Sequence, residues 1–189
     1  DYLPAAKIIP QSQAMYDALH EICKEMASSY KREVEFLLEV APLICERKGL
    51  SKARVIEEKI LQVAKGKGIA KSSLIPVAVM SCLYEDNRGE IPLVCRKIIK
   101  PRYGYDAADA HNCISDLRAL KLLVMGSFMG NLAFCTRDKN LAAFWCMLSP
   151  KVSYKDERRT DVTLALRAEL FPRLDHDEVS RLRERLTGA

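Results

Sequence analysis

Apolar side chains recur every three or four residues along much of the chain, which is the spacing of one face of an α-helix. Residues 12–47 follow this pattern and predict a long helix that Pro42 kinks or ends. Residues 51–68 follow it as well, and two glycines near their end are typical of a helix stop. We therefore expect the first third of the chain to be helical.

The middle of the chain is more apolar. Residues 72–86 are almost continuously hydrophobic, so they form either a buried helix with Pro76 in its first turn or a buried strand that leads into a helix. Residues 107–125 carry an apolar stripe at helical spacing and predict a strong helix. Residues 132–136 predict a short buried strand, and a further helix is expected to start directly after Asp138. A helix, a strand and a helix in this order predict a β-α unit with a parallel strand.

The composition of the chain changes after this unit. Residues 149–163 are polar and highly charged, which indicates a linker or surface loop. Residues 175–189 predict a short helix that is capped by Asp175 or Asp177. Its apolar stripe consists of Val179, Leu182 and Leu186.

Composition narrows the class of protein. Hydrophobic residues make up 49% of the 189 residues, which is enough for a core. The net charge of +5 is compatible with nucleic-acid binding without proving it. No apolar run is as long as a membrane span, and the start of the chain has no signal-peptide pattern. The seven cysteines are widely spaced and form no C-x-x-C pair, so we expect reduced thiols and a cytoplasmic protein.

Candidate chemistry lies on the predicted helix 107–125. Asp109, Asn112 and Asp116 are spaced so that they share one face of it, among small neighbours. Such a face is either a solvated surface or a place that a ligand can approach. Asp138 stands between the predicted strand and the next helix. It is either a helix N-terminal acid or, since functional groups gather at the carboxyl ends of strands, a second arm of a carboxylate cluster.

Residues 105–148 resemble the C-terminal half of PIN-like metal-dependent nucleases. The shared pattern is an aspartate on a buried helix, a glycine, a short strand and then T-x-D with a following helix. Asp116 matches the helix aspartate, and "TRDK" at residues 136–139 matches the T-x-D element. The resemblance implies a helix-rich, three-layer α/β fold with a small parallel sheet. We expect this domain over residues 1–150, and a charged linker with a C-terminal helix over 151–189.

The chemistry that the resemblance implies is a carboxylate cluster that binds one or two Mg²⁺ or Mn²⁺ ions and activates water for attack on a phosphodiester. Asp116 and Asp138 would be metal ligands, with Asp109 and Asn112 in or next to the coordination shell. Thr136 would orient Asp138 through its hydroxyl. Four basic residues would meet substrate phosphates: Arg137, Lys139, Lys100 and Arg102.

Two metal ligands of the family pattern have no single counterpart in this chain. The family begins with a buried strand that ends in a metal-binding aspartate, and the chain starts at Asp1 without one. We therefore expect the first strand to be missing from the sheet and one ligand to be missing from the site. The family's mid-chain glutamate matches Glu57, which we prefer as a metal ligand, or Glu85. For both, an ordinary surface glutamate on an amphipathic helix is the simpler interpretation.

Taken together, the resemblance predicts a metal-dependent nuclease, most simply an endoribonuclease of a toxin or phage-defence type. Its substrate would be RNA or, alternatively, DNA. An inhibitory protein partner and a homodimer are compatible with this function, and no membrane partner is expected. The alternative is a non-catalytic module that binds nucleic acid or protein through a degenerate acidic site.

Overall fold

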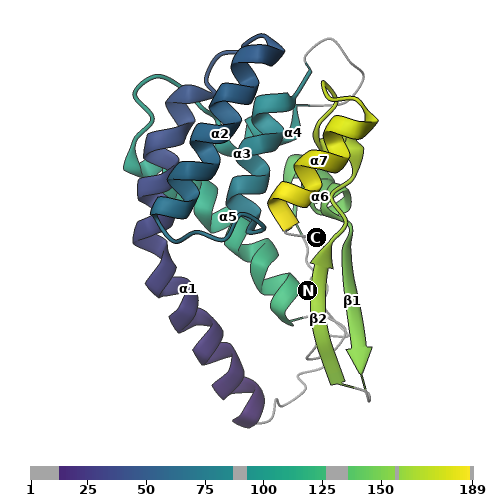
Figure 1. Cartoon of the computed structure of the whole chain (residues 1–189). Coiled ribbons are helices and arrows are strands. Elements are labelled where there is room, and N and C mark those ends of the chain that lie inside the picture. The colour runs from purple at the N-terminus through teal and green to yellow at the C-terminus, as the bar shows by residue number, and fades with distance from the viewer. Residues whose placement is uncertain (1–12, 87–92, 127–135, 156–157, 188–189) are drawn as a thin grey trace.

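The computed structural model describes residues 13–86, 93–126, 136–155 and 158–187 (Figure 1). Helices dominate these residues. They are α1 (Gln13–Val40), α2 (Leu50–Gly66), α3 (Leu74–Tyr84), α4 (Val94–Ile99), α5 (Ala107–Gly126), α6 (Lys139–Leu148) and α7 (His176–Thr187), with short 3-10 helices η1 (Ala41–Leu43) and η3 (Ala168–Leu170). Two strands, β1 (Pro150–Lys155) and β2 (Arg158–Leu164), form the sheet of the described part.

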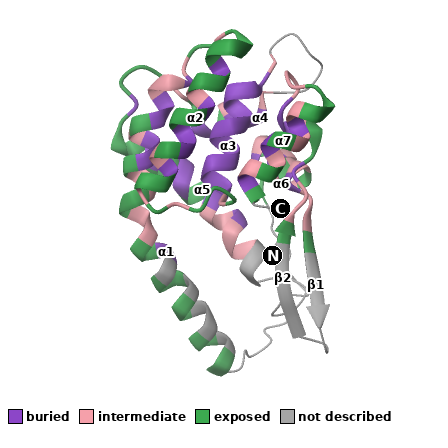
Figure 2. Cartoon of the chain, in the orientation of Figure 1, coloured by how far each residue is buried: buried purple, intermediate pink, exposed green. Residues whose placement is uncertain are grey.

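The core is built around α3. Every residue from Leu74 to Tyr84 is buried, which Figure 2 shows as a continuous buried helix in the middle of the molecule. The apolar run at residues 72–86 therefore forms a buried helix with Pro76 in its first turn, as one of the two interpretations predicted. Ser81 is the polar exception in this helix, and its hydroxyl donates to the Leu170 carbonyl at 2.8 Å. Burial of this polar group is thus compensated by a hydrogen bond.

The long first helix packs against α5, the helix that carries the acidic face. α1 ends at Val40, and Pro42 follows in η1, as the sequence predicts. Arg118 of α5 binds Glu33 of α1 at 2.8 Å, and the Tyr30 hydroxyl lies 2.6 Å from His111 Nδ1. The first half of α1 extends beyond the helical body (Figure 1). These contacts fix the orientation of α5 from the side of α1.

The sheet differs from the prediction. β1 and β2 pair antiparallel, with Val152 opposite Val162, in the segment that we expected to be a linker or loop. Its charges suggested a loop, but its valine, tyrosine and threonine residues favour strands. The parallel strand expected at residues 132–136 lies outside the described residues except for Thr136, which is in neither helix nor strand. The described part is therefore helix-rich with one antiparallel hairpin, and it contains no parallel strand pair.

The C-terminal helix belongs to the same core as the other helices. The side chains of Val179, Leu182 and Leu186 are buried and join the central hydrophobic cluster. Asp175 accepts a hydrogen bond from the Glu178 N–H at 2.9 Å, and the Glu178 carboxylate accepts one from the Asp175 N–H. This reciprocal pair is a capping box, so Asp175 rather than Asp177 caps α7.

Two further sequence expectations concern the whole chain. No helix within the described residues is long and apolar enough to cross a membrane. The six described cysteines are free thiols, three of them buried in the core, and Cys135 lies outside the described residues. Buried thiols behave as small apolar side chains, which agrees with the prediction of reduced core cysteines.

Candidate functional site

Asp138 occupies the N-cap of α6, as the helix-start interpretation predicts. Its Oδ1 accepts hydrogen bonds from the N–H groups of Asn140 at 2.7 Å and Leu141 at 3.2 Å. Thr136 Oγ1 accepts from the Asp138 N–H at 3.0 Å, so the hydroxyl contacts the backbone of Asp138 and not its carboxylate. Partial burial opposes ionisation of Asp138, but the two helix N–H groups, the Asn140 side chain and the charge of Lys100 together lower the pKa of the carboxyl.

Asp116 is exposed on the outer face of α5, within electrostatic range of Asp138. Loss of water around its carboxyl raises the pKa of Asp116, and the negative charge of Asp138 raises it further. The ammonium of Lys100 acts in the opposite direction. The two aspartates that the resemblance implies as metal ligands therefore belong to neighbouring helices, and the charge of Asp138 acts on the pKa of Asp116.

Lys100 is the basic residue whose charge acts on both Asp116 and Asp138. It ends α4 in the left-handed conformation, with φ of 54°, and is exposed. Its charge favours the ionised form of Asp109, Asp116 and Asp138, although burial and Asp138 still raise the pKa of Asp116. An exposed lysine ammonium near two acids can balance their charge or meet a phosphate of a bound substrate.

Asp109 has a structural role at the start of α5. Asp106 Oδ1 accepts from the N–H groups of Ala108 and Asp109, and Asp109 Oδ2 accepts from the Asp106 N–H. Arg102 also donates to Asp109 Oδ2, at 2.9 Å, and this hydrogen bond is the largest cause of the lowered pKa of Asp109. Asp109 and Arg102 are therefore engaged with each other and with a helix cap. The D-x-x-D spacing from Asp106 to Asp109 was the sequence signal for this cap, and we missed it.

The remaining residues of the predicted site are exposed. Asn112 lies on the same outer face of α5 as Asp116. Arg137 and Lys139 stand at the start of α6, and neither forms an ion pair in the part of the chain that the structure describes. Together with Lys100, they leave three cations near the Asp116–Asp138 pair that are accessible to an anionic ligand.

Glu57, the preferred mid-chain ligand, is placed elsewhere. It is only 1% exposed, and it accepts hydrogen bonds from the Tyr84 hydroxyl and from Arg185. Arg185 reaches it from α7 and also binds Glu58 at 2.7 Å. Glu57 therefore forms a buried ion pair between α2 and α7 and does not join Asp116. Sequence reasoning could not find this role, because Arg185 is 128 residues away along the chain.

Glu85, the other mid-chain glutamate, is also buried and also structural. Its Oε1 accepts from the N–H groups of Cys95 at 2.8 Å and Arg96 at 3.1 Å, at the start of α4. Burial raises the pKa of Glu85 despite these N–H groups and the nearby Arg96 guanidinium. The carboxylate thus holds α4 against the end of α3.

The described residues contain no group of three or more histidine, cysteine, aspartate or glutamate side chains that could hold a metal ion. Asp116 and Asp138 nevertheless offer two carboxylates of the type that hard cations prefer. Mg²⁺ is commonly held by one or two carboxylates, with water and substrate phosphate completing its shell. The pair therefore fits a single such ion in ligand type. A two-metal cluster has no further carboxylates to bind it in the described part.

Comparison with known proteins identified no relative of this chain: no family model, no curated protein and no solved structure matched it.

Proposed function

We propose that this protein is a PIN-like nuclease that hydrolyses phosphodiester bonds of RNA and depends on Mg²⁺ or Mn²⁺. The observation that supports this proposal is the Asp116–Asp138 pair. Two acids from separate helices lie close enough for Asp138 to raise the pKa of Asp116. A fold gains no stability from placing like charges together, and such pairs with perturbed pKa values are found preferentially at functional sites.

Asp116 and Asp138 would hold the metal ion, which would lower the pKa of a bound water and polarise the scissile phosphate. The Asp138 Oδ1 caps α6, so its carboxylate is fixed in direction by two helix N–H groups. Lys100, Arg137 and Lys139 are exposed cations around the pair and would bind the phosphates on either side of the cleaved bond. Thr136 would hold the turn that presents Asp138, through its contact with the Asp138 N–H.

The test is cleavage of a labelled RNA in Mg²⁺ or Mn²⁺ by the parent chain and by Asp116→Asn and Asp138→Asn variants. Asparagine is as good an N-cap as aspartate, so Asp138→Asn should keep α6 intact while removing the charge. Both variants should lose cleavage. Asp177→Asn is the matched control, because Asp177 is an exposed acid on α7, a helix that carries no residue of the proposed site. Equal activity of the parent and both variants would refute the proposal.

Metal binding can be measured without turnover. A ligand that binds only the native state raises the melting temperature, by an amount that grows with ligand concentration over Kd. Millimolar Mn²⁺ should therefore raise the melting temperature of the parent, and Asp116→Asn should remove most of this rise. An unchanged melting temperature would argue against a metal site at the pair.

A non-catalytic binding module is the second candidate, and one observation favours it. The carboxylates of Asp109 and Asp138 both serve as helix caps, and Lys100 already supplies a cation to the acidic site. In that case the parent should bind RNA with Kd values unaffected by Mg²⁺, and should leave the RNA intact. Cleavage that is lost in Asp116→Asn would exclude this second function.

A further inference from the structure

Positive charge is concentrated on α2 and the loop that follows it. Residues 50–73 hold six basic and two acidic residues, a surplus of four in a chain with a net charge of +5. Both acids, Glu57 and Glu58, bind Arg185 of α7. This one guanidinium offsets one of their two negative charges, so α2 and its following loop keep a surplus of positive charge.

The outer face of α2 has a regular composition. One exposed stripe runs along the helix at spacings of three and four residues and contains no acid. Its members are Lys52, Val55, Lys59, Gln62 and Gly66. In the part of the chain that the structure describes, Lys52 and Lys59 form no ion pair. Unpaired lysines on a stripe without acids leave a positive surface that its own helix does not balance.

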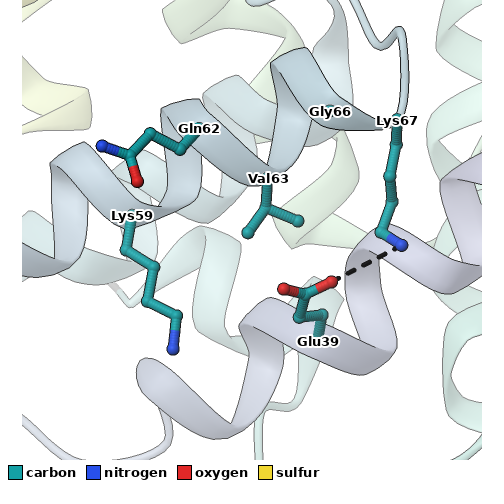
Figure 3. Close-up of a pocket in the computed structure, with 6 residues that line it drawn as sticks. All are labelled: Glu39, Lys59, Gln62, Val63, Gly66 and Lys67. Atoms are coloured by element: carbon teal, nitrogen blue, oxygen red, sulfur yellow. Dashed lines mark ion pairs between the residues drawn. The ribbon is translucent and has the colours of Figure 1, made fainter.

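A groove lies beside this stripe, where α2 meets α1. It has a volume of about 410 Å³ and is lined by Glu39, Lys59, Gln62, Val63, Gly66 and Lys67. Figure 3 shows Lys59 and Lys67 extending from α2 towards α1 on either side of Glu39. Lys67 is bound to Glu39 at 3.5 Å and to Glu35 at 3.8 Å, whereas Lys59 forms no ion pair with any described residue. The groove is open to solvent, so it suits an extended chain better than an enclosed small molecule.

The spacing of the cations indicates the kind of ligand. Lys52 and Lys59 are seven residues apart, which is roughly 10 Å along a helix that rises about 1.5 Å per residue. Cations so far apart cannot converge on one small anion. They can each meet a different charge of a long polyanion, and lysine commonly binds phosphate as a point charge.

We propose that the outer face of α2, with its groove against α1, binds the sugar–phosphate backbone of single-stranded nucleic acid. The choice of nucleic acid rather than an acidic protein as the ligand rests on the proposed function. The positive charge of the surface is observed independently of that function. Lys59 and Lys52 contact phosphates. Gln62 donates a hydrogen bond from its amide, and Gly66 allows the strand to approach the helix. This surface lies on α1 and α2, whereas the Asp116–Asp138 pair lies on α5 and α6.

The experiment is binding of a fluorescent 20-nucleotide RNA, followed by anisotropy at several salt concentrations in EDTA, so that no metal-dependent cleavage occurs. Each lost phosphate contact should reduce the slope of log K against log salt by about 0.7 for a single strand. Lys59→Ala should therefore lower the slope by about 0.7, and the Lys52→Ala/Lys59→Ala double variant by about 1.4. Lys97→Ala is the matched control, since Lys97 is an exposed lysine on α4.

Two outcomes would overturn the proposal. One is a slope that Lys59→Ala changes no more than Lys97→Ala does. The other is displacement of the RNA by a polyglutamate peptide of equal charge at equal concentration, which would show that the surface prefers an acidic protein. Failure of the nuclease proposal is distinguishable from both. An Asp116→Asn variant that binds RNA with the parent's slope, together with a parent that never cleaves, would refute only the nuclease.

Discussion

Replacement of Arg185 by methionine is expected to destabilise the fold by about 3 kcal/mol. The change leaves Glu57 without its cationic partner, and Glu57 is only 1% exposed. Removing one partner of a buried ion pair typically costs about 3–5 kcal/mol, because the other charge stays buried and unpaired. The Arg185 side chain is 30% exposed, so water already screens part of the pair and the lower end of this range applies.

The Tyr84 hydroxyl does not compensate for this loss. It already donates to Glu57, and both burial and this carboxylate raise the pKa of Tyr84, so the hydroxyl stays protonated. One hydrogen bond from a neutral donor cannot replace a guanidinium. In the Arg185→Met variant, Glu57 would therefore be left with this single neutral donor inside the core.

The assay is urea unfolding at pH 7, followed by far-UV circular dichroism and by the fluorescence of Trp145, the single tryptophan of the chain. A loss of about 3 kcal/mol corresponds to a fall in melting temperature of roughly 6–12 °C for a chain of this size. Glu58→Gln is the matched control, because it removes a 56% exposed partner of the same guanidinium and should cost at most about 1 kcal/mol.

A double-mutant cycle isolates the pair itself. Glu57→Gln combined with Arg185→Met removes both charges, so it should be more stable than Arg185→Met alone. The reasoning is refuted if Arg185→Met costs no more than Glu58→Gln, or if adding Glu57→Gln brings a further loss. Either result would mean that water reaches Glu57 in solution, although α2, α3 and α7 bury it in the structure.

Three further perturbations test other contacts. Asp138→Ala removes the N-cap of α6 and should cost about 1 kcal/mol by urea unfolding, whereas Asp138→Asn should cost only a few tenths. Burial raises the pKa of Glu85 above 4.5, so the protonated side chain stabilises the fold at low pH, and this stability is lost as the pH rises from 4.5 through the folded pKa. Glu85→Gln should therefore make the free energy of unfolding less dependent on pH in that window. An unchanged pH profile would contradict this cause. Leu182→Ala should cost about 2–5 kcal/mol if α7 is part of the core, and a loss below 1 kcal/mol would indicate a loosely attached helix.

The helices were predictable from sequence because their signals are local. The apolar spacing of residues 107–125 and the position of Asp138 reproduce α5 and the start of α6 closely. The run at 72–86 needed the tertiary structure to choose between helix and strand, since a segment buried on all sides has no amphipathic period. The hairpin of β1 and β2 was wrongly assigned as a linker, because its many charges hid residues that favour strands.

Some features of the candidate site also follow from the sequence, whereas others follow only from the fold. The sequence by itself determined which residues carry carboxylates and that Asp109, Asn112 and Asp116 share a face of one helix. Only the tertiary structure decided that the charge of Asp138 acts on Asp116, that Asp109 is bound to Arg102, and that Glu57 belongs to a buried pair with Arg185. The physical reason is that helical faces follow from a local period, whereas charge partners are chosen by packing between segments far apart in the chain.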